Sequence, residues 1–568
     1  IPDCLDRVEV SKGPASSVYG GNAMGGVINL VTSRPAAKLQ GLLKTFAGSY
    51  GTFGGLFTLG GKTGTGLKGF YYQVNGFYRQ GSGYIVVPES ARDSMDVKTS
   101  LKEFLVSGKV GYQFGKKNYT EIEYSHYNDK RGDGFRVSEP EGGYNEYPTD
   151  ALRITSNNQF GRFSLLVSAF YQDEFYHRLS ESLAAKKGNK YSMYKTDSRR
   201  IDQGFWSNLT YYGKHGMSYT LGIDLKSGRV DGSDTYYTST DVLTNKGKMD
   251  FSAIFGEYEW HTLKQKLIIM AGLRFDMARF HDGSFVIAEP TSLTSFMSLY
   301  PAVFSDQDWQ AVSPKIGLKY TFSNTLNIYV LYARGFRPPM LDDMCKNGNV
   351  TKGFKLANPQ LKPETIDNYE AGCDWRPFTG VVFRPSVYYS VGRDFQYFIN
   401  TGDSINTGGD KDKPIIRRQN VSRVRILGAE ATLQWQVFKR VTLMASYAFN
   451  DSRITEFLSP EDSKYLNGKF IMEVPRNQLS AGLFWNNRIV QTSLTYTYRD
   501  DQWGDDENTQ VTPGYSLFDL KIGHTFFKQV NVNCVIQDIF NTRFFDSKGN
   551  LSPGRFFMLN LAYRFSKK

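Results

Sequence analysis

The chain has 568 residues, of which 15% are aromatic and 22% charged, and its net charge at pH 7 is +12. No apolar run reaches the roughly 18 residues that a membrane-spanning helix needs, so the sequence excludes transmembrane helices. Lys and Arg are spread along the chain instead of forming a tail or a helix face, so we expect no nucleic-acid binding.

The first distinctive elements lie in residues 7–32, which read RVEVSKGPASSVYGGNAMGGVINLVT. The pattern predicts a strand, a tight Lys-Gly-Pro turn, a glycine-rich bend and a second strand. The stretch closely resembles the end of the plug domain of TonB-dependent outer-membrane receptors. The matching positions are Arg7, Glu9, Lys12, Gly13, Pro14, Tyr19 and Gly20.

The resemblance has a consequence for domain organisation. In that family the motif closes a much longer plug, which the TonB energy-transducing complex contacts. Only six residues precede it here, so we expect residues 1–36 to be the C-terminal remnant of an N-terminally truncated plug. The segment that contacts TonB is then missing from this sequence.

From residue 37 onward, apolar and polar residues alternate in segments of about 9–15 residues, which is typical of tilted strands that cross a bilayer. In 264–276, for example, Leu273 lies on an apolar side while Arg274 and Asp276 lie on a polar side. We count about 22 such segments, and strands in lipid must close because open edges are not tolerated there. The sequence therefore predicts an all-β fold, with a transmembrane antiparallel barrel over residues 37–568.

The connections between these strands alternate in length, and bacterial barrels place short turns in the periplasm and long loops outside. The long polar connections are predicted at 84–102, 131–148, 178–197, 231–247, 280–310, 336–363, 400–420, 451–474 and 500–513. Residues 64–69 fit a G-x-G-x-x-G nucleotide motif, but a strand follows instead of a helix, so we interpret them as a hairpin turn.

Residues 334–364 resemble the paired F-R-A-P and N-P-x-L-x-P-E elements of the same receptors. Two later strands carry Glu370 and Glu430, at places where glutamates of the family face inward and pair with basic plug residues. The resemblance implies that these two carboxylates clasp Arg7 or Lys12. The alternative is a pair of solvated carboxylates that simply face the lumen.

Signals for catalysis are absent from the pattern. We find no G-x-S-x-G nucleophile elbow and no histidines at metal-binding spacing, so we expect no enzyme. Cys345 and Cys373 could pair in an oxidising compartment, or both could remain free thiols.

The resemblance implies active uptake of a scarce chelate across the bacterial outer membrane, and we expect a ferric siderophore. Siderophores are often anionic and aromatic, so loop cations and aromatic rings suit them. Candidate binding residues are Tyr236, Tyr237, Tyr300, Phe304, Trp309, Arg337, Arg417, Arg418 and Trp503. Residues 338–358 lack the histidine that haem receptors carry there, which counts against haem.

Several alternatives stay open. The cargo could be cobalamin or haem, and a passive diffusion channel is the alternative of another class. One acidic loop could hold calcium, although a solvated loop needs no metal; its residues are Asp500, Asp501, Asp505, Asp506 and Glu507. No other cofactor is expected. Besides TonB, the expected partners are outer-membrane lipid and a surface lipoprotein over the long loops.

Overall fold

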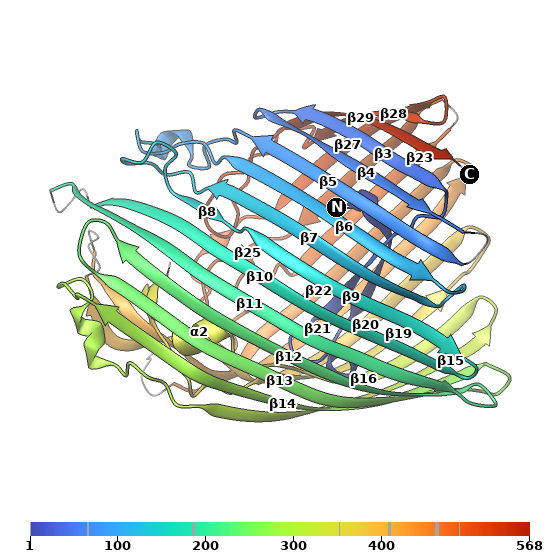
Figure 1. The fold of residues 1–568 in the computed structure, drawn as a ribbon, viewed down its shortest axis with the longest axis horizontal. Coiled ribbons are helices and arrows are strands. Elements are labelled where there is room, and N and C mark those ends of the chain that lie inside the picture. The colour runs from blue at the N-terminus through green and yellow to red at the C-terminus, as the bar shows by residue number, and fades with distance from the viewer. Residues whose placement is uncertain are drawn as a thin grey trace.

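The computed structural model describes residues 2–64, 68–184, 188–350, 353–406, 411–459, 465–487 and 489–567. In these residues the chain forms a closed antiparallel barrel of 22 long strands (Figure 1). The ring closes where β29 (Phe556–Lys567) pairs with β3 (Leu39–Gly48). The predicted all-β transmembrane barrel is therefore confirmed.

The barrel strands follow one another in chain order around the ring. The other long strands are β4 (Thr52–Lys62), β5 (Gly69–Gly81), β6 (Leu101–Gln113), β7 (Tyr119–Gly132), β9 (Thr149–Phe160), β10 (Phe163–Ala184), β11 (Lys190–Tyr212), β12 (Met217–Tyr236), β13 (Val242–Thr262), β14 (Leu267–Ala288), β15 (Gln307–Ser323), β16 (Leu326–Arg337), β19 (Glu364–Trp375), β20 (Val381–Ile405), β21 (Lys413–Phe438), β22 (Val441–Phe457), β23 (Asn477–Asn486), β24 (Gln491–Arg499), β27 (Tyr515–Phe526) and β28 (Val530–Gln537). Each connection between neighbours is therefore local.

Short elements fill the connections between these strands. They are η2 (Glu89–Ala91), β8 (Tyr144–Glu146), η4 (Ser295–Leu299), α2 (Leu341–Cys345), β17 (Gly348–Val350), β18 (Gly353–Leu356), β25 (Gln502–Trp503) and β26 (Val511–Thr512). No helix in the part of the chain that the structure describes is both long and apolar enough to cross a membrane.

Side chains alternate across the barrel wall, as the sequence predicted. On β14, Leu273 faces outward and is 57% exposed, whereas Arg274 and Asp276 face the lumen and are buried. Apolar outward positions can meet lipid while polar inward positions meet the lumen, which explains how a chain of low mean hydropathy crosses a membrane.

The two rims differ in their connections. One rim carries short turns, such as 161–162, 324–325 and 439–440, and is the periplasmic rim by the length rule. The opposite rim carries long segments, including 289–306 and 338–363. The predicted turn at 64–69 joins β4 to β5 on the periplasmic side; its residues 65–67 lie outside the described residues.

Much of the chain predicted as loops at 178–197, 231–247 and 400–420 is strand instead. In these places β10 to β13 and the β20–β21 pair run on beyond the expected length, up to 26 residues in β21. Polar strands can extend into water because the cross-strand ladder still satisfies their backbone groups. Residues 185–187 and 407–410, at two of the hairpin ends, are outside the described part.

A small hairpin lies inside the ring, seen in dark blue in Figure 1. It consists of η1 (Pro2–Cys4), β1 (Leu5–Lys12), α1 (Ser16–Tyr19) and β2 (Gly26–Thr32), and β1 pairs with β2 antiparallel. We call residues 5–32 the lumen hairpin. Its strand, turn, bend and strand follow the order that the sequence predicted.

Candidate functional site

The tip of the lumen hairpin contacts the wall formed by β14 to β21. Lys12, the last residue of β1, forms an ion pair with Glu430 on β21. The next residue, Gly13, has a φ of +71°, and a side chain there would meet Asn368 and Glu370 of β19. Both glutamates of the predicted clasp therefore lie at the tip, although only Glu430 pairs with a cation of the hairpin.

Of the two basic residues that the clasp hypothesis offered, Arg7 pairs within its own strand. Its guanidinium pairs with Glu9 at 2.6 Å and with Asp6 at 2.9 Å, both on its own strand. Glu370 instead accepts a hydrogen bond of 2.7 Å from the hydroxyl of Tyr329 on β16. The structure thus places Lys12 at the barrel glutamates and keeps Arg7 within β1.

A further contact at the tip involves Arg274 of β14. Its side chain is only 3% exposed and donates hydrogen bonds of 2.9 Å to Asp276 and 2.8 Å to Asp224. The same guanidinium donates to the carbonyl of Val18 in α1, at 3.3 Å. Two carboxylates therefore hold one arginine in a fixed orientation toward the hairpin.

This arginine explains one glycine of the motif. Gly20 has a φ of +79°, which favours glycine, and an added Cβ would lie 2.6 Å from Nη2 of Arg274. Sequence reasoning did not single out Arg274, although an arginine and an aspartate two residues apart on a lumen-facing strand were a visible signal.

The base of the hairpin is anchored to the opposite wall. Arg34, just after β2, pairs with Glu121 of β7 through two hydrogen bonds of 2.7 and 3.0 Å. The buried Tyr71 donates to the same carboxylate at 2.7 Å, and the Arg34 guanidinium lies 3.5 Å from the centre of the Tyr119 ring. The lumen hairpin therefore crosses the barrel between two polar anchors.

The middle of the hairpin is far less enclosed than its ends. Val10 of β1 is 62% exposed and Ile28 of β2 is 68% exposed. Exposed branched residues contribute little burial energy. Contacts at the two ends thus hold the hairpin in place: polar contacts at both, together with packing of Ala15 and Ala23, which are buried at the tip.

The extracellular mouth is narrowed by α2, β17 and β18, which we call the mouth ledge. Helix α2 packs against β13 and β14, with Met344 and Cys345 fully buried in a cluster that includes Phe280. Strand β18 pairs in parallel with β21. Burial raises the pKa of the Cys345 thiol to about 12. Cys345 and Cys373 are both free thiols.

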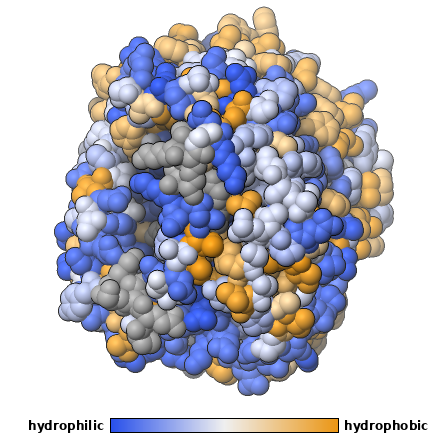
Figure 2. All heavy atoms as spheres, turned by 90° about the vertical axis from the view of Figure 1, so that its left-hand side faces the viewer, coloured by the Kyte–Doolittle hydropathy of each residue, from blue (hydrophilic) through white to orange (hydrophobic). Residues whose placement is uncertain are grey.

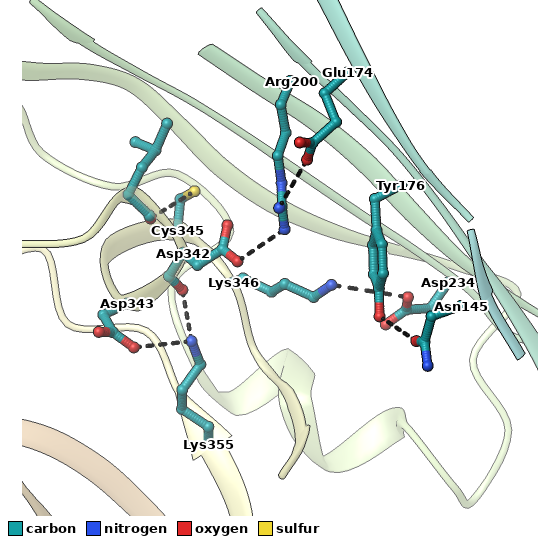
Figure 3. A network of polar contacts seen from close by, with 11 residues as sticks. Asn145, Glu174, Tyr176, Arg200, Asp234, Asp342, Asp343, Cys345, Lys346 and Lys355 are labelled. Atoms are coloured by element: carbon teal, nitrogen blue, oxygen red, sulfur yellow. Dashed lines mark hydrogen bonds and ion pairs between the residues drawn. The ribbon is translucent and has the colours of Figure 1, made fainter. Parts of the chain in front are cut away.

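Ion pairs join the mouth ledge to the barrel wall (Figure 3). Arg200 of β11 bridges Glu174 at 3.2 Å and Asp342 of α2 at 3.4 Å. Lys355 of β18 pairs with Asp343 at 3.1 Å, which also lies 3.2 Å from Arg418 of β21. These contacts fix the ledge inside the mouth.

Most of the predicted binding aromatics belong to packing. Phe304 is buried in the cluster beneath the ledge, and Tyr236, Tyr300 and Trp309 pack against that cluster. Tyr237 is 59% exposed. Trp503, in β25, pairs with β26.

The predicted cations lie nearer the ledge. Arg337 pairs with the buried Glu364, and the guanidinium of Arg418 lies 4.4 Å from the ring centre of Phe398. Arg417 of β21 is the register partner of Leu356 in the ledge. Arg418 and Arg417 are thus brought together with the ledge, whereas Trp503 is not.

Sequence reasoning also missed Arg178. It follows Tyr176 by two residues on β10, so both side chains share the lumen face with Glu174 and Arg200, and it lies beside Tyr194. It forms no ion pair with any residue in the described ranges, unlike its neighbour Arg200. Figure 2, which looks onto this end, shows a largely hydrophilic mouth with a hollow and some apolar groups at its centre.

The acidic loop at 500–507 shows a local hydrogen-bond network. Asp505 accepts bonds from the backbone and hydroxyl of Thr509 and from the amide of Gln510, and Asp501 accepts one from Gly514. Nowhere in the described residues do three His, Cys, Asp or Glu side chains come together in a group that could hold a metal ion. Of the two alternatives for this loop, calcium binding and a solvated loop without metal, we therefore predict the solvated loop.

Comparisons with known proteins agree with this architecture. Residues 103–537 match the family described as TonB dependent receptor-like, beta-barrel. The ferrioxamine B receptor of Salmonella typhimurium is 23% identical over 573 residues, covering 92% of this chain and 74% of the relative. The metal-pseudopaline receptor of Pseudomonas aeruginosa is 22% identical over 603 residues, covering 97% and 78%.

A solved structure shows the same fold. The ferric yersiniabactin uptake receptor from Yersinia pestis superposes with a TM-score of 0.77 at 16% identity, covering 99% of this chain and 85% of that one. The relatives are receptors and not enzymes, in agreement with the absence of a catalytic motif. The chain belongs to the TonB-dependent receptors of the bacterial outer membrane.

Proposed function

We propose that this receptor actively imports a ferric siderophore. The observation that carries the proposal is the lumen hairpin, which spans the barrel between Arg34 at its base and Lys12 and Arg274 at its tip. A pulling force can break such contacts one at a time, since an exposed ion pair such as that of Lys12 contributes little and a single hydrogen bond from a charged donor contributes only about 1.5–3 kcal/mol. The TonB complex supplies that force in this proposal, through chain that precedes the hairpin.

The chemistry of the mouth supports an anionic cargo. Arg178 lies on the lumen face between two tyrosines and forms no ion pair within the described residues, although Asp133 and Asp234 lie near enough to raise its pKa. Its guanidinium therefore keeps donors for an anionic ligand. A planar guanidinium suits carboxylate, catecholate or hydroxamate oxygens. The names of the two relatives, one a ferrioxamine B receptor and one a metal-pseudopaline receptor, support a metal chelate.

Uptake by cells tests the proposal. A strain without its own chelate receptors, carrying the complete receptor, is offered iron-labelled hydroxamate, catecholate and phenolate siderophores, haem and labelled cobalamin. We expect accumulation of one class of ferric siderophore, and only when TonB is present. Accumulation of cobalamin or haem alone would contradict a ferric siderophore as the cargo. Accumulation without TonB would favour the passive channel.

A paired set of variants tests the mouth. Arg178→Gln removes the lumen-facing cation, and we expect the apparent affinity for the transported chelate to fall about tenfold, because a charge-assisted hydrogen bond is lost. Arg162→Gln removes an exposed arginine from the periplasmic turn before the same strand and serves as the matched control. Equal uptake by both variants contradicts the role of Arg178.

The surface lipoprotein partner stays a prediction.

A further inference from the structure

The outward face of β11 to β14 shows where the membrane ends. The rows nearer the periplasmic rim are apolar or aromatic. Tyr211, Tyr219 and Tyr258 form one such row, with ring centres 6.4 and 5.1 Å apart. The first polar row is Gln203, Ser227, Asp250 and Arg279, eight residues further along β11. Eight residues cover roughly 26 Å of strand, or about 20 Å of height at a barrel tilt of about 40°.

Further charged residues follow directly beyond this row, on the side of the extracellular rim. Arg199, Asp231 and Lys246 are register partners across β11, β12 and β13, and Arg229 is the partner of Lys248 in the adjoining row. These rows point away from the lumen, because Arg274 and Asp224 on the same strands point into it. The charged rows therefore stand at the level of the lipid headgroups in the outer leaflet.

A hollow of about 390 Å³ lies within these rows. Arg199, Arg229, Lys246 and Lys248 line it together with two carboxylates, Asp231 and Asp282. Four cations against two carboxylates give the lining a net charge of +2. A bulge in β14 at Asp282 and Gly283 lies opposite Gly247, which separates the two lysines.

The four cations differ in what they already bind. Lys246 pairs with Asp231 at 3.0 Å and Lys248 with Asp282 at 2.8 Å. Arg199 pairs with Asp173 at 2.6 Å. Arg229 is exposed and forms no ion pair with any side chain that the structure describes. Once these three ion pairs are counted, one uncompensated arginine remains in the hollow.

We propose that this hollow binds a phosphate group on the headgroup of an outer-leaflet lipid, with Arg229 as the principal contact. The guanidinium fork suits two phosphate oxygens, and the flanking lysines add attraction as point charges. The acyl chains of such a lipid then lie along the apolar rows immediately below. The cargo is not the ligand, because this face is separated from the lumen by the barrel wall.

Lipid binding to the purified chain tests the assignment. The probes are diphosphorylated lipid A, the same lipid with its phosphates removed, and inorganic phosphate as a competitor, with retention measured by native mass spectrometry from detergent. We expect wild type to retain the phosphorylated lipid about tenfold better than the dephosphorylated one. Arg229→Gln should lose most of this preference, and Arg162→Gln should keep it.

Other outcomes overturn the proposal. Equal retention of both lipids by wild type removes the phosphate contact, and this comparison needs no variant to fold. Equal loss in Arg229→Gln and Arg162→Gln removes the site from this hollow. Displacement of the lipid by inorganic phosphate at equal concentration shows a general anion site instead. Heat-modifiable mobility on gels confirms that each variant barrel is folded.

Discussion

Arg274→Met should loosen the tip of the lumen hairpin while the barrel stays folded. Methionine keeps much of the side-chain volume but removes the charge between Asp276 and Asp224 and the hydrogen bond to the Val18 carbonyl. A hydrogen bond from a charged donor contributes about 1.5–3 kcal/mol. Because the hydrogen bond to Val18 is long, at 3.3 Å, we take the lower end of this range as the free energy that the substitution removes from the tip contact.

Hydrogen exchange measures this change directly. The amide of Asn22 bonds to the carbonyl of Phe336 on β16, so it exchanges only when the tip separates from the barrel wall. A loss of about 1.5 kcal/mol makes that exchange roughly tenfold faster.

The control is the same substitution at the other anchor. Arg34→Met should accelerate exchange at the base, for example at Ser33, whose amide bonds to Cys4, and leave the tip amides unchanged. Unchanged exchange at Asn22 in a folded Arg274→Met barrel would refute the view that polar anchors hold the hairpin.

Four further outcomes are expected. Lys12→Gln should accelerate tip exchange by less than about fivefold, because an exposed ion pair contributes only about 0–1 kcal/mol; a larger effect contradicts the exposed pairing with Glu430. Cys345 should resist maleimide at pH 7.5 and react on unfolding, since burial raises its pKa to about 12; equal labelling rates in both states contradict this. Burial alone raises the pKa of Asp241, but hydroxyl and amide donors of the next extracellular loop outweigh burial and lower it. The stability that ionised Asp241 contributes is present above its unfolded-state pKa and is lost as pH falls through its folded-state pKa. Proteolysis of 289–306 should therefore increase at acid pH in wild type. The variant Asp241→Asn should be cleaved readily at neutral pH as well. Calcium should not raise the melting temperature, because Asp505 already accepts protein donors; an increase of several degrees shows a bound ion.

The barrel could be predicted because one face of each strand must contact lipid while the other face contacts the lumen. Apolar and polar residues therefore alternate along the sequence, as in Leu273 and Arg274. The sheet must also close into a barrel, because open strand edges are not tolerated in lipid. The requirement ends where the strands leave the membrane. The extensions of β10 to β13 and of β20 and β21 are mostly polar, with isolated buried apolar residues such as Leu243 and Ile415, so no regular alternation separated strand from loop.

The candidate site was less predictable for a different reason. Aromatic content does not say whether a ring packs or stays open, and Phe304 is buried whereas Tyr237 is exposed. The contact between Arg274 and Val18 joins residues 256 positions apart, and no local signal reports such a pair. Lys12 and Glu430 could be paired in advance only because a family resemblance placed both.

The two anchors of the lumen hairpin are not equivalent in one further respect. The base continues within a few residues into β3, so the covalent chain holds it beside β3 to β7 even when the Arg34 contact breaks. The tip has no such tether, because Lys12 and α1 touch β14 to β21 through side chains and single hydrogen bonds. The hairpin can thus pivot about its covalent link to the first barrel strands, while its tip can separate from the opposite wall. Any passage that it opens runs along β14 to β21, directly beneath the mouth ledge.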